Sequence, residues 1–276
     1  MPSIYQGDRG AGPEPTVICV HASGGSGAQW KALADKLRHD FQVLTPDLHG
    51  HGSAPSWLGM PADIVAADTA RISRLAAQVE GRVHLVGHSY GGAIALRVAR
   101  HRPRSVESVV VYEPVTLRLL FDYNRKHRAA AEVAEVASDI GRALSGGDYE
   151  RAARCFVDYW SGEGQWARLS PERQVAMALR MPVIQAQFTS LFHDSVRRAG
   201  YASVSMPVLY LAGRDTRAST RRIAELLTYT LPDVELETLD GMGHLGPVTH
   251  AEPIAQRIAD FVRRQTAPRL PDRKAA

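Results

Sequence analysis

The chain has 276 residues, of which 45% are hydrophobic and 22% are charged, a composition typical of a soluble globular protein. This length suits one large α/β domain or one domain with an inserted subdomain. The net charge is +4, but the basic residues are scattered, so the composition argues against a nucleic-acid partner. Residues 1–15 contain no apolar run, and no segment approaches 18 consecutive apolar residues. We therefore expect no signal peptide, no membrane span and a cytoplasmic location.

Strand and helix patterns alternate in the first part of the chain. Short apolar runs predict buried strands, and amphipathic or capped segments predict helices. The expected strands are 16–20, 41–48, 82–87 and 106–112, with an edge strand near 3–6, and the expected helices are 29–38, 63–79 and 91–101. This βαβαβαβ order predicts a parallel sheet with helices on both faces.

The alternation stops between residues 115 and 204, where no buried strand is found. Helices are expected there near 116–124, 126–144, 148–160, 170–181 and 183–198, with Pro182 ending or kinking the fourth. Strands at 207–212 and 234–239 and helices at 219–230 and 251–264 then resume the pattern. The predicted organisation is a core of residues 1–114 and 205–265, a helical cap of residues 115–204, and a disordered tail of residues 266–276.

The most informative stretch is Gly87-His88-Ser89-Tyr90-Gly91, which lies between an expected strand and an expected helix. This G-x-S-x-G pattern is the signature of a nucleophile elbow. The turn at Ser89 has to be so sharp that side chains at positions 87 and 91 would collide, which glycine avoids. The following helix directs its positive N-terminal end at the serine hydroxyl. Ser89 is therefore the candidate nucleophile.

A serine hydroxyl needs a base, and the candidate is His244, in the glycine-rich loop after the last expected strand. His250 is the competitor, but its position at the start of a helix is better explained by packing. Asp215 follows the preceding strand and is the candidate acid that orients the imidazole. It also suits the N-cap of the next helix. Glu113, at the end of strand 106–112, is the alternative acid.

With Ser89, Asp215 and His244 each following a strand in this order, the sequence resembles the α/β-hydrolase superfamily. The loop at residues 21–25, the turn at 47–52, the elbow and the pairs Gly213-Arg214-Asp215 and Gly243-His244 carry the resemblance. It implies the α/β-hydrolase fold, with a mostly parallel six- to eight-stranded sheet, helices on both faces and an inserted helical cap. The short N-terminus departs from the family and predicts fewer strands than eight.

The resemblance also implies an oxyanion hole made by the backbone N–H groups of Ser23 and Tyr90. His21 is expected to brace the first of these two loops. His49 and His51 have metal-ligand spacing, but no further ligand cluster accompanies them, so we expect no metal and no cofactor.

A substrate pocket is expected between the core and the cap. Large apolar residues recur at helical spacing in the cap, and most of them serve packing. The residues that we expect to contact substrate are Ala22, His88, Trp160, Met181 and Phe188.

A serine at the elbow attacks carbonyl carbon, whereas relatives that displace at saturated carbon use aspartate. The sequence therefore favours a serine hydrolase acting on small to medium, largely apolar carboxylic esters or lactones. A hydrolase of C–C bonds in vinylogous diketones and a non-catalytic ligand receptor are the alternatives. The expected partner is a small-molecule ester, and the oligomeric state is open between a monomer and a homodimer.

Overall fold

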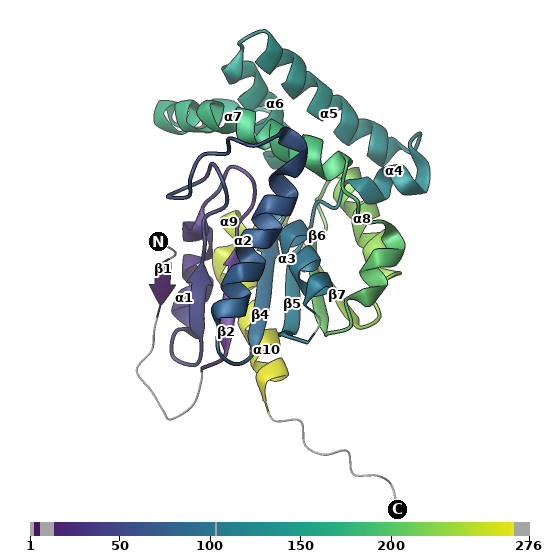
Figure 1. Ribbon diagram of the computed structural model, residues 1–276. Coiled ribbons are helices and arrows are strands. Elements are labelled where there is room, and N and C mark those ends of the chain that lie inside the picture. The colour runs from purple at the N-terminus through teal and green to yellow at the C-terminus, as the bar shows by residue number, and fades with distance from the viewer. Residues whose placement is uncertain (1–2, 6–13, 103, 268–276) are drawn as a thin grey trace, which may run out of the picture.

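The computed structural model describes residues 3–5, 14–102 and 104–267, and its centre is one mixed sheet (Figure 1). Within these residues the sheet has seven strands in the order β1-β3-β2-β4-β5-β6-β7. All neighbouring strands pair in parallel except β1, which is antiparallel to β3. The structure confirms the predicted α/β-hydrolase class and a strand number within the expected range.

The strands follow the predicted apolar runs closely. They are β1 (Ser3–Tyr5), β2 (Thr16–Val20), β3 (Gln42–Thr45), β4 (Val83–His88), β5 (Val106–Tyr112), β6 (Val208–Gly213) and β7 (Val234–Leu239). Strand β3 ends before the predicted position 48 because Pro46 follows it and has no N–H to donate to the sheet. Strand β7 forms the edge beyond β6 and is partly exposed.

Helices cover both faces of the sheet, so every central strand is buried. On one face α1 (Lys31–Leu37) packs against α10 (Ala251–Thr266), and on the other α2 (Ile64–Gln78) packs against α3 (Tyr90–His101). Strand β2 shows the alternation, since Val17 and Cys19 belong to the first core and Ile18 and Val20 to the second. The remaining core helices and turns are η1 (Gly27–Trp30), η2 (Pro61–Asp63), α8 (Ala218–Thr228) and α9 (Gly246–Thr249).

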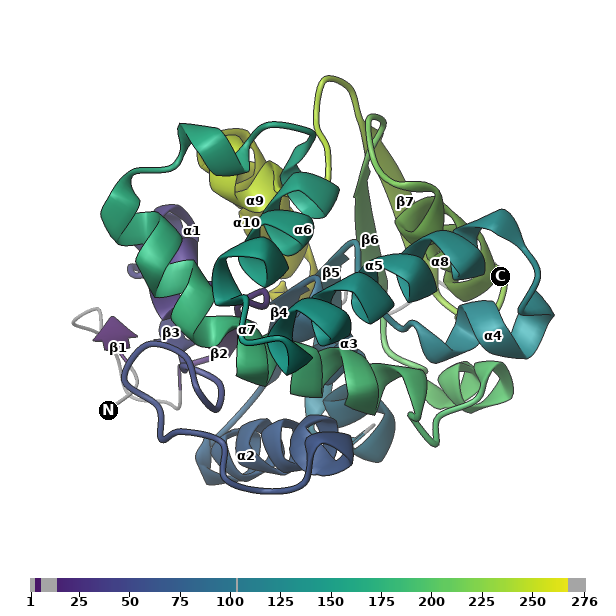
Figure 2. The same ribbon diagram turned by 90° about the horizontal axis from the view of Figure 1, so that it is seen from above.

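The segment between β5 and β6 is helical and lies above the sheet (Figures 1 and 2). It comprises α4 (Arg118–Asn124), α5 (Arg128–Ser145), α6 (Tyr149–Ser161), η3 (Trp166–Arg168), α7 (Pro171–Phe192) and η4 (Arg198–Ser203). In the view from above, α5, α6 and α7 cross over the ends of the central strands (Figure 2). We call α4–α7 the helical cap; the division of the chain into a core and a cap domain stays a prediction.

Pro182 does not end a helix, because α7 is a single helix of 22 residues that runs through this proline. The alternative, a kink at Pro182, stays a prediction. Proline removes one hydrogen bond from a helix interior. Here the neighbouring Met181 and Ile184 are buried in the core, and this packing holds the helix together. Ser170 caps its first turn and Pro171 takes the first helical position, as the sequence predicts.

Two further expectations concern the ends of the chain. Helix α10 continues to Thr266, the first residue of the expected tail, and most of that tail (residues 268–276) lies outside the described residues. Residue 6 of the expected edge strand also lies outside them. Among the described helices, none combines the length and the apolar composition needed to cross a membrane.

The fold buries a histidine in β4 that titrates abnormally. His84 is fully buried and hydrogen-bonds through Nδ1 to Ser108 Oγ (2.8 Å) and through Nε2 to Thr266 Oγ1 (3.0 Å). Burial penalises the imidazolium and lowers the pKa of His84 from 6.5 to about 4. The protein therefore keeps this side chain neutral under conditions in which the unfolded chain would protonate it.

We predict that His84 makes the free energy of unfolding depend on pH between about 6.5 and 4. Above 6.5 the group is neutral in both states; as the pH falls towards 4 only the unfolded chain gains a proton, so stability is lost. The loss attributable to His84 is roughly 3 kcal/mol, from 1.36 kcal/mol for each unit of pKa shift. Urea unfolding of wild type and His84→Gln between pH 7.5 and 4 measures it. The variant should lose less stability over this range, and identical pH dependence in both proteins would contradict the assignment.

Candidate active site

The sharp turn at Ser89 joins the end of β4 to the start of α3. Ser89 has φ 54° and ψ −116°, a backbone conformation that residues with a side chain rarely adopt. A Cβ on Gly87 would lie 2.4 Å from Gly91 O, and one on Gly91 would lie 2.2 Å from Val20 O. Both glycines are therefore required by close backbone contacts, and they allow the turn to present the serine side chain.

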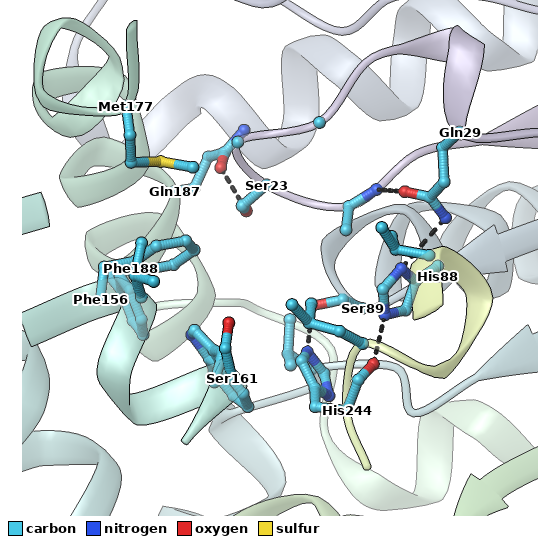
Figure 3. A pocket seen from close by; sticks show the side chains of 18 of the residues that line it. Ser23, Gln29, His88, Ser89, Phe156, Ser161, Met177, Gln187, Phe188 and His244 are labelled. Carbon is cyan, nitrogen blue, oxygen red and sulfur yellow. Dashed lines mark hydrogen bonds between the residues drawn. The ribbon is translucent and has the colours of Figure 1, made fainter. Parts of the chain in front are cut away.

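His244 lies in the loop after β7 and contacts Ser89. Its Nε2 is 2.9 Å from Ser89 Oγ, and its Nδ1 is 2.7 Å from Glu113 Oε2. A carboxylate can only accept, so Nδ1 carries the proton and Nε2 accepts from the serine hydroxyl. The imidazole thus has the tautomer that a general base needs. Figure 3 shows His244 directed at Ser89.

Glu113 follows β5 and is completely buried. Its backbone has φ 42°. Among the described residues other than glycine, only Ser89 and Glu113 have positive φ. Oε1 accepts from the Gly213 N–H (2.8 Å), and Oε2 accepts from the Thr216 hydroxyl (2.6 Å) as well as from His244. These donors compensate the loss of water around a buried carboxylate.

Asp215 does not contact the imidazole, and its predicted position as the partner of His244 is wrong. Its side chain is exposed, and its backbone N–H donates to Met242 O (2.9 Å). Strands β5 and β6 are neighbours, so Glu113 and Asp215 both follow strands at the same edge of the sheet. The backbone at Glu113 turns its side chain towards His244, and Glu113, the alternative acid in the sequence, occupies the place expected for Asp215.

His250, the competing candidate for the base, is exposed, and its Nδ1 lies 2.8 Å from the Thr249 hydroxyl.

One of the expected oxyanion donors, Tyr90, directly follows Ser89 in the chain. Tyr90 is the first residue of α3, so its N–H has no acceptor within the helix. Its side chain is anchored by a hydrogen bond from the hydroxyl to the buried Asp68 Oδ2 (2.9 Å). Ser23 lies in the small-residue loop after β2 and lines the same cavity as Ser89.

Buried imidazoles hold the loops around Ser89. His21 donates from Nδ1 to Ala22 O (2.8 Å) and accepts at Nε2 from the Leu48 N–H (3.0 Å). Burial lowers the pKa of His21 to about 4, so the ring stays neutral near neutral pH, and both of its nitrogens are already used within the protein. This geometry agrees with the bracing role expected for His21.

His88 connects the Ser23 loop to the His244 loop. Its Nε2 donates to His244 O (2.8 Å), and its Nδ1 accepts from Gln29 Nε2 (3.1 Å). Gln29 in turn accepts from the Ala22 N–H (3.2 Å). Burial and the nearby His244 lower the pKa of His88 well below its usual value. His88 lines the cavity as expected, but both of its ring nitrogens are already used within the protein.

His49 and His51 take part in hydrogen bonds of the loops. His49 Nδ1 lies 2.7 Å from Asp68 Oδ1, and His51 Nε2 accepts from the Gly24 N–H (3.0 Å). His49 therefore connects its turn to α2, which contains Asp68, and His51 braces the loop at Gly24. Among the described residues, no three His, Cys, Asp or Glu side chains form a group that could hold a metal ion.

A cavity of about 230 Å³ opens above Ser89. Its floor comes from the core loops and its walls from α6 and α7 of the cap (Figure 3). Ala22, His88, Trp160 and Phe188 line it as expected, whereas Met181 is buried in the core and does not. Met177, one turn earlier on α7, lines the cavity instead.

The cavity wall also contains residues that the sequence analysis did not single out. Gln29 and Gln187 are polar, and Leu191 and Leu245 are apolar. No local pattern in the sequence distinguishes them from ordinary helix and loop residues. Gln187 and Leu191 reach the cavity through the placement of α7 over the sheet, whereas Gln29 belongs to η1 and Leu245 to the loop before α9.

Trp160 stacks on the imidazole of His244. The ring centroids are 4.1 Å apart and the planes are inclined by 29°. Trp160 and His244 also line a second, more polar cavity, which contains Asp215, Arg217 and His250. The indole thus lies between the apolar cavity and the polar one, with its face against the imidazole.

Comparison with known proteins agrees with this architecture. Residues 17–257 match the model of the alpha/beta hydrolase family, and the chain belongs to this family. It is 27% identical to lipase LipV of Mycobacterium tuberculosis, over 92% of this chain and 94% of that protein. It is also 27% identical to a pimeloyl-[acyl-carrier protein] methyl ester esterase of Aromatoleum aromaticum, over 90% of this chain and 98% of that protein.

The fold is also similar to that of an enol-lactonase from Burkholderia xenovorans. The TM-score is 0.73 at 16% identity, with 95% of this chain and 96% of that chain covered. At this identity the likeness concerns the fold. The two relatives above are hydrolases by name, and they identify the chain as a hydrolase.

Proposed function

We propose that the protein hydrolyses small to medium, largely apolar carboxylic esters, and lactones by the same chemistry, through an acyl-enzyme on Ser89. The observation that supports this most directly is the hydrogen-bonded series Ser89–His244–Glu113 at the floor of an apolar cavity. A hydroxyl joined to a neutral imidazole that is oriented by a carboxylate is the arrangement required for nucleophilic attack on a carbonyl.

In the first half-reaction His244 Nε2 accepts the proton of Ser89 as Oγ attacks the ester carbonyl. The N–H groups of Ser23 and Tyr90 stabilise the oxyanion, each contributing about 3–4 kcal/mol. His244 then returns the proton to the leaving alcohol, which departs and leaves the acyl group on Ser89. In the second half-reaction His244 deprotonates water, the hydroxide attacks the acyl carbonyl, and Ser89 leaves with the proton as the acid is released.

Glu113 takes the orienting role in this proposal. It accepts from Nδ1 of His244 and stabilises the imidazolium that forms during attack. Thr216 and the Gly213 N–H keep the carboxylate in position through their own hydrogen bonds to it. Asp215 has no part in these steps.

The cavity lining favours an uncharged substrate. Among the described residues that line it, none is an arginine or lysine. A diketone acid, the substrate of the C–C bond hydrolases, would bury its carboxylate there without a counter-ion, which is unfavourable. The cavity volume of about 230 Å³ suits an acyl group of small to medium size.

We predict that Ser89→Ala lowers kcat by a factor on the order of 10⁶. The measurement uses p-nitrophenyl esters of increasing acyl length, beside a lactone and a diketone acid, for wild type and variant. Wild type should also react with a fluorophosphonate and the variant should not. Near-normal turnover by the variant would contradict the nucleophile. Labelling without ester turnover would contradict the esterase, and faster cleavage of the diketone acid would indicate the C–C hydrolase.

A second prediction separates the two histidines near the C-terminal helix. His244→Ala should reduce kcat/KM severely, because Ser89 then lacks a base. His250→Ala should retain most activity, because His250 is exposed and directed at Thr249. Steady-state kinetics with the best ester of the panel tests the pair, and the reverse order of effects would identify His250 as the base.

A third prediction compares the two carboxylates. Glu113→Gln should lower kcat by roughly 10⁴, because an amide facing Nδ1 no longer enforces the required tautomer. Asp215→Asn should change kcat/KM by no more than about threefold, as expected for an exposed position. Both substitutions preserve side-chain shape, so the ratio of the two effects is the informative quantity. A larger loss in Asp215→Asn than in Glu113→Gln would contradict the role given to Glu113.

A further inference from the structure

The otherwise apolar cavity has a polar corner on the cap side. Gln187, on α7, is only 1% exposed and lines the cavity. The hydroxyl of Ser23 donates to Gln187 Oε1 at 2.5 Å. Figure 3 shows this pair beside the loop that carries Ser23, with Met177 nearby.

The amide nitrogen of Gln187 has no partner in the part of the chain that the structure describes. A buried N–H₂ group without an acceptor is unfavourable, because it has lost its hydrogen bonds to water. Met177, Phe188 and Leu191 also line the cavity, and their side chains carry no oxygen acceptor. The described residues therefore leave this donor unpaired.

The position of this donor relates it to the reacting carbonyl. Ser23 supplies a backbone N–H to the oxyanion hole in the proposed mechanism, and its side chain holds the Gln187 amide. An acceptor bound by Gln187 would therefore lie a short chain length from the scissile carbonyl. Because Oε1 is fixed by Ser23, the amide is already oriented before substrate binds.

We propose that Gln187 is a specificity-determining residue that donates a hydrogen bond to an uncharged oxygen in the acyl chain of the ester, such as an oxo group. This inference rests on the proposed esterase function. The acceptor is uncharged because the described lining supplies no cation to balance a carboxylate. A site that contains an unpaired buried donor discriminates against substrates that cannot pair with it.

The test compares esters that differ only in an oxo group. The probes are the p-nitrophenyl esters of pentanoate and 4-oxopentanoate, and of hexanoate and 5-oxohexanoate, with spontaneous hydrolysis measured in the presence of Ser89→Ala. Wild type should favour the better oxo ester over its alkyl counterpart by about tenfold in kcat/KM, the effect of one neutral hydrogen bond. The two oxo positions sample the reach of the amide.

Gln187→Leu should bring the ratio of kcat/KM for oxo over alkyl esters down to about one, whatever its effect on the alkyl esters themselves. Gln185→Leu is the matched control, because Gln185 lies on the same helix but lines a different groove, with Ser138 and Phe192. The control should keep the oxo preference of wild type. Thermal unfolding of both variants confirms that they are folded.

Equal kcat/KM for oxo and alkyl esters in wild type, or a preference that persists in Gln187→Leu, would overturn the inference while leaving the esterase proposal in place. Failure of wild type to hydrolyse any ester or to react with a fluorophosphonate would overturn the proposed function itself. The two failures are therefore distinguishable in one set of assays.

Discussion

The hydrogen bond between His244 and Glu113 is the interaction on which the arrangement of the site depends. It joins residues 131 positions apart, and the bond from His244 to Ser89 spans 155. Both partners of the first bond are buried, so neither can exchange the other for water without moving. The bond fixes the imidazole tautomer, and the tautomer decides whether the serine hydroxyl has an acceptor. This contact therefore links the packing of distant segments to the proposed chemistry.

The loops around that contact are held by neutral imidazoles. Gln29 and His88 connect the Ala22 N–H to the carbonyl of His244, so the loop that bears the expected oxyanion donor and the loop that bears the base are tied to one another. Burial lowers the pKa of His21 and of His88, and both remain uncharged near neutral pH. Because these imidazoles are uncharged, the electrostatic field at Ser89 comes from Glu113, the N-terminal end of the helix and the expected oxyanion donors.

The sequence predicts the sheet, the turn at Ser89 and the histidine that contacts it, because each has a local signature. Strands appear as apolar runs, and Gly87 and Gly91 mark the turn. The partner of the imidazole has no such signature. Glu113 and Asp215 follow adjacent strands, and only the backbone conformation at Glu113 decides which carboxylate turns towards His244.

Met177 and Met181 present the same difficulty, since both lie on α7 and the sequence does not tell how that helix is rotated over the cavity. Packing between distant segments also explains why α7 continues through Pro182.

The positions of the cavity residues divide them between two parts of the molecule. Ser89 and His244 belong to loops at the strand ends, whereas Met177, Gln187 and Phe188 belong to α7. Mutations that accumulate on this one helix can reshape the wall of the cavity without displacing the groups that contact the serine. An ancestral protein with this arrangement could diversify in the molecules that it accepts while conserving its reaction.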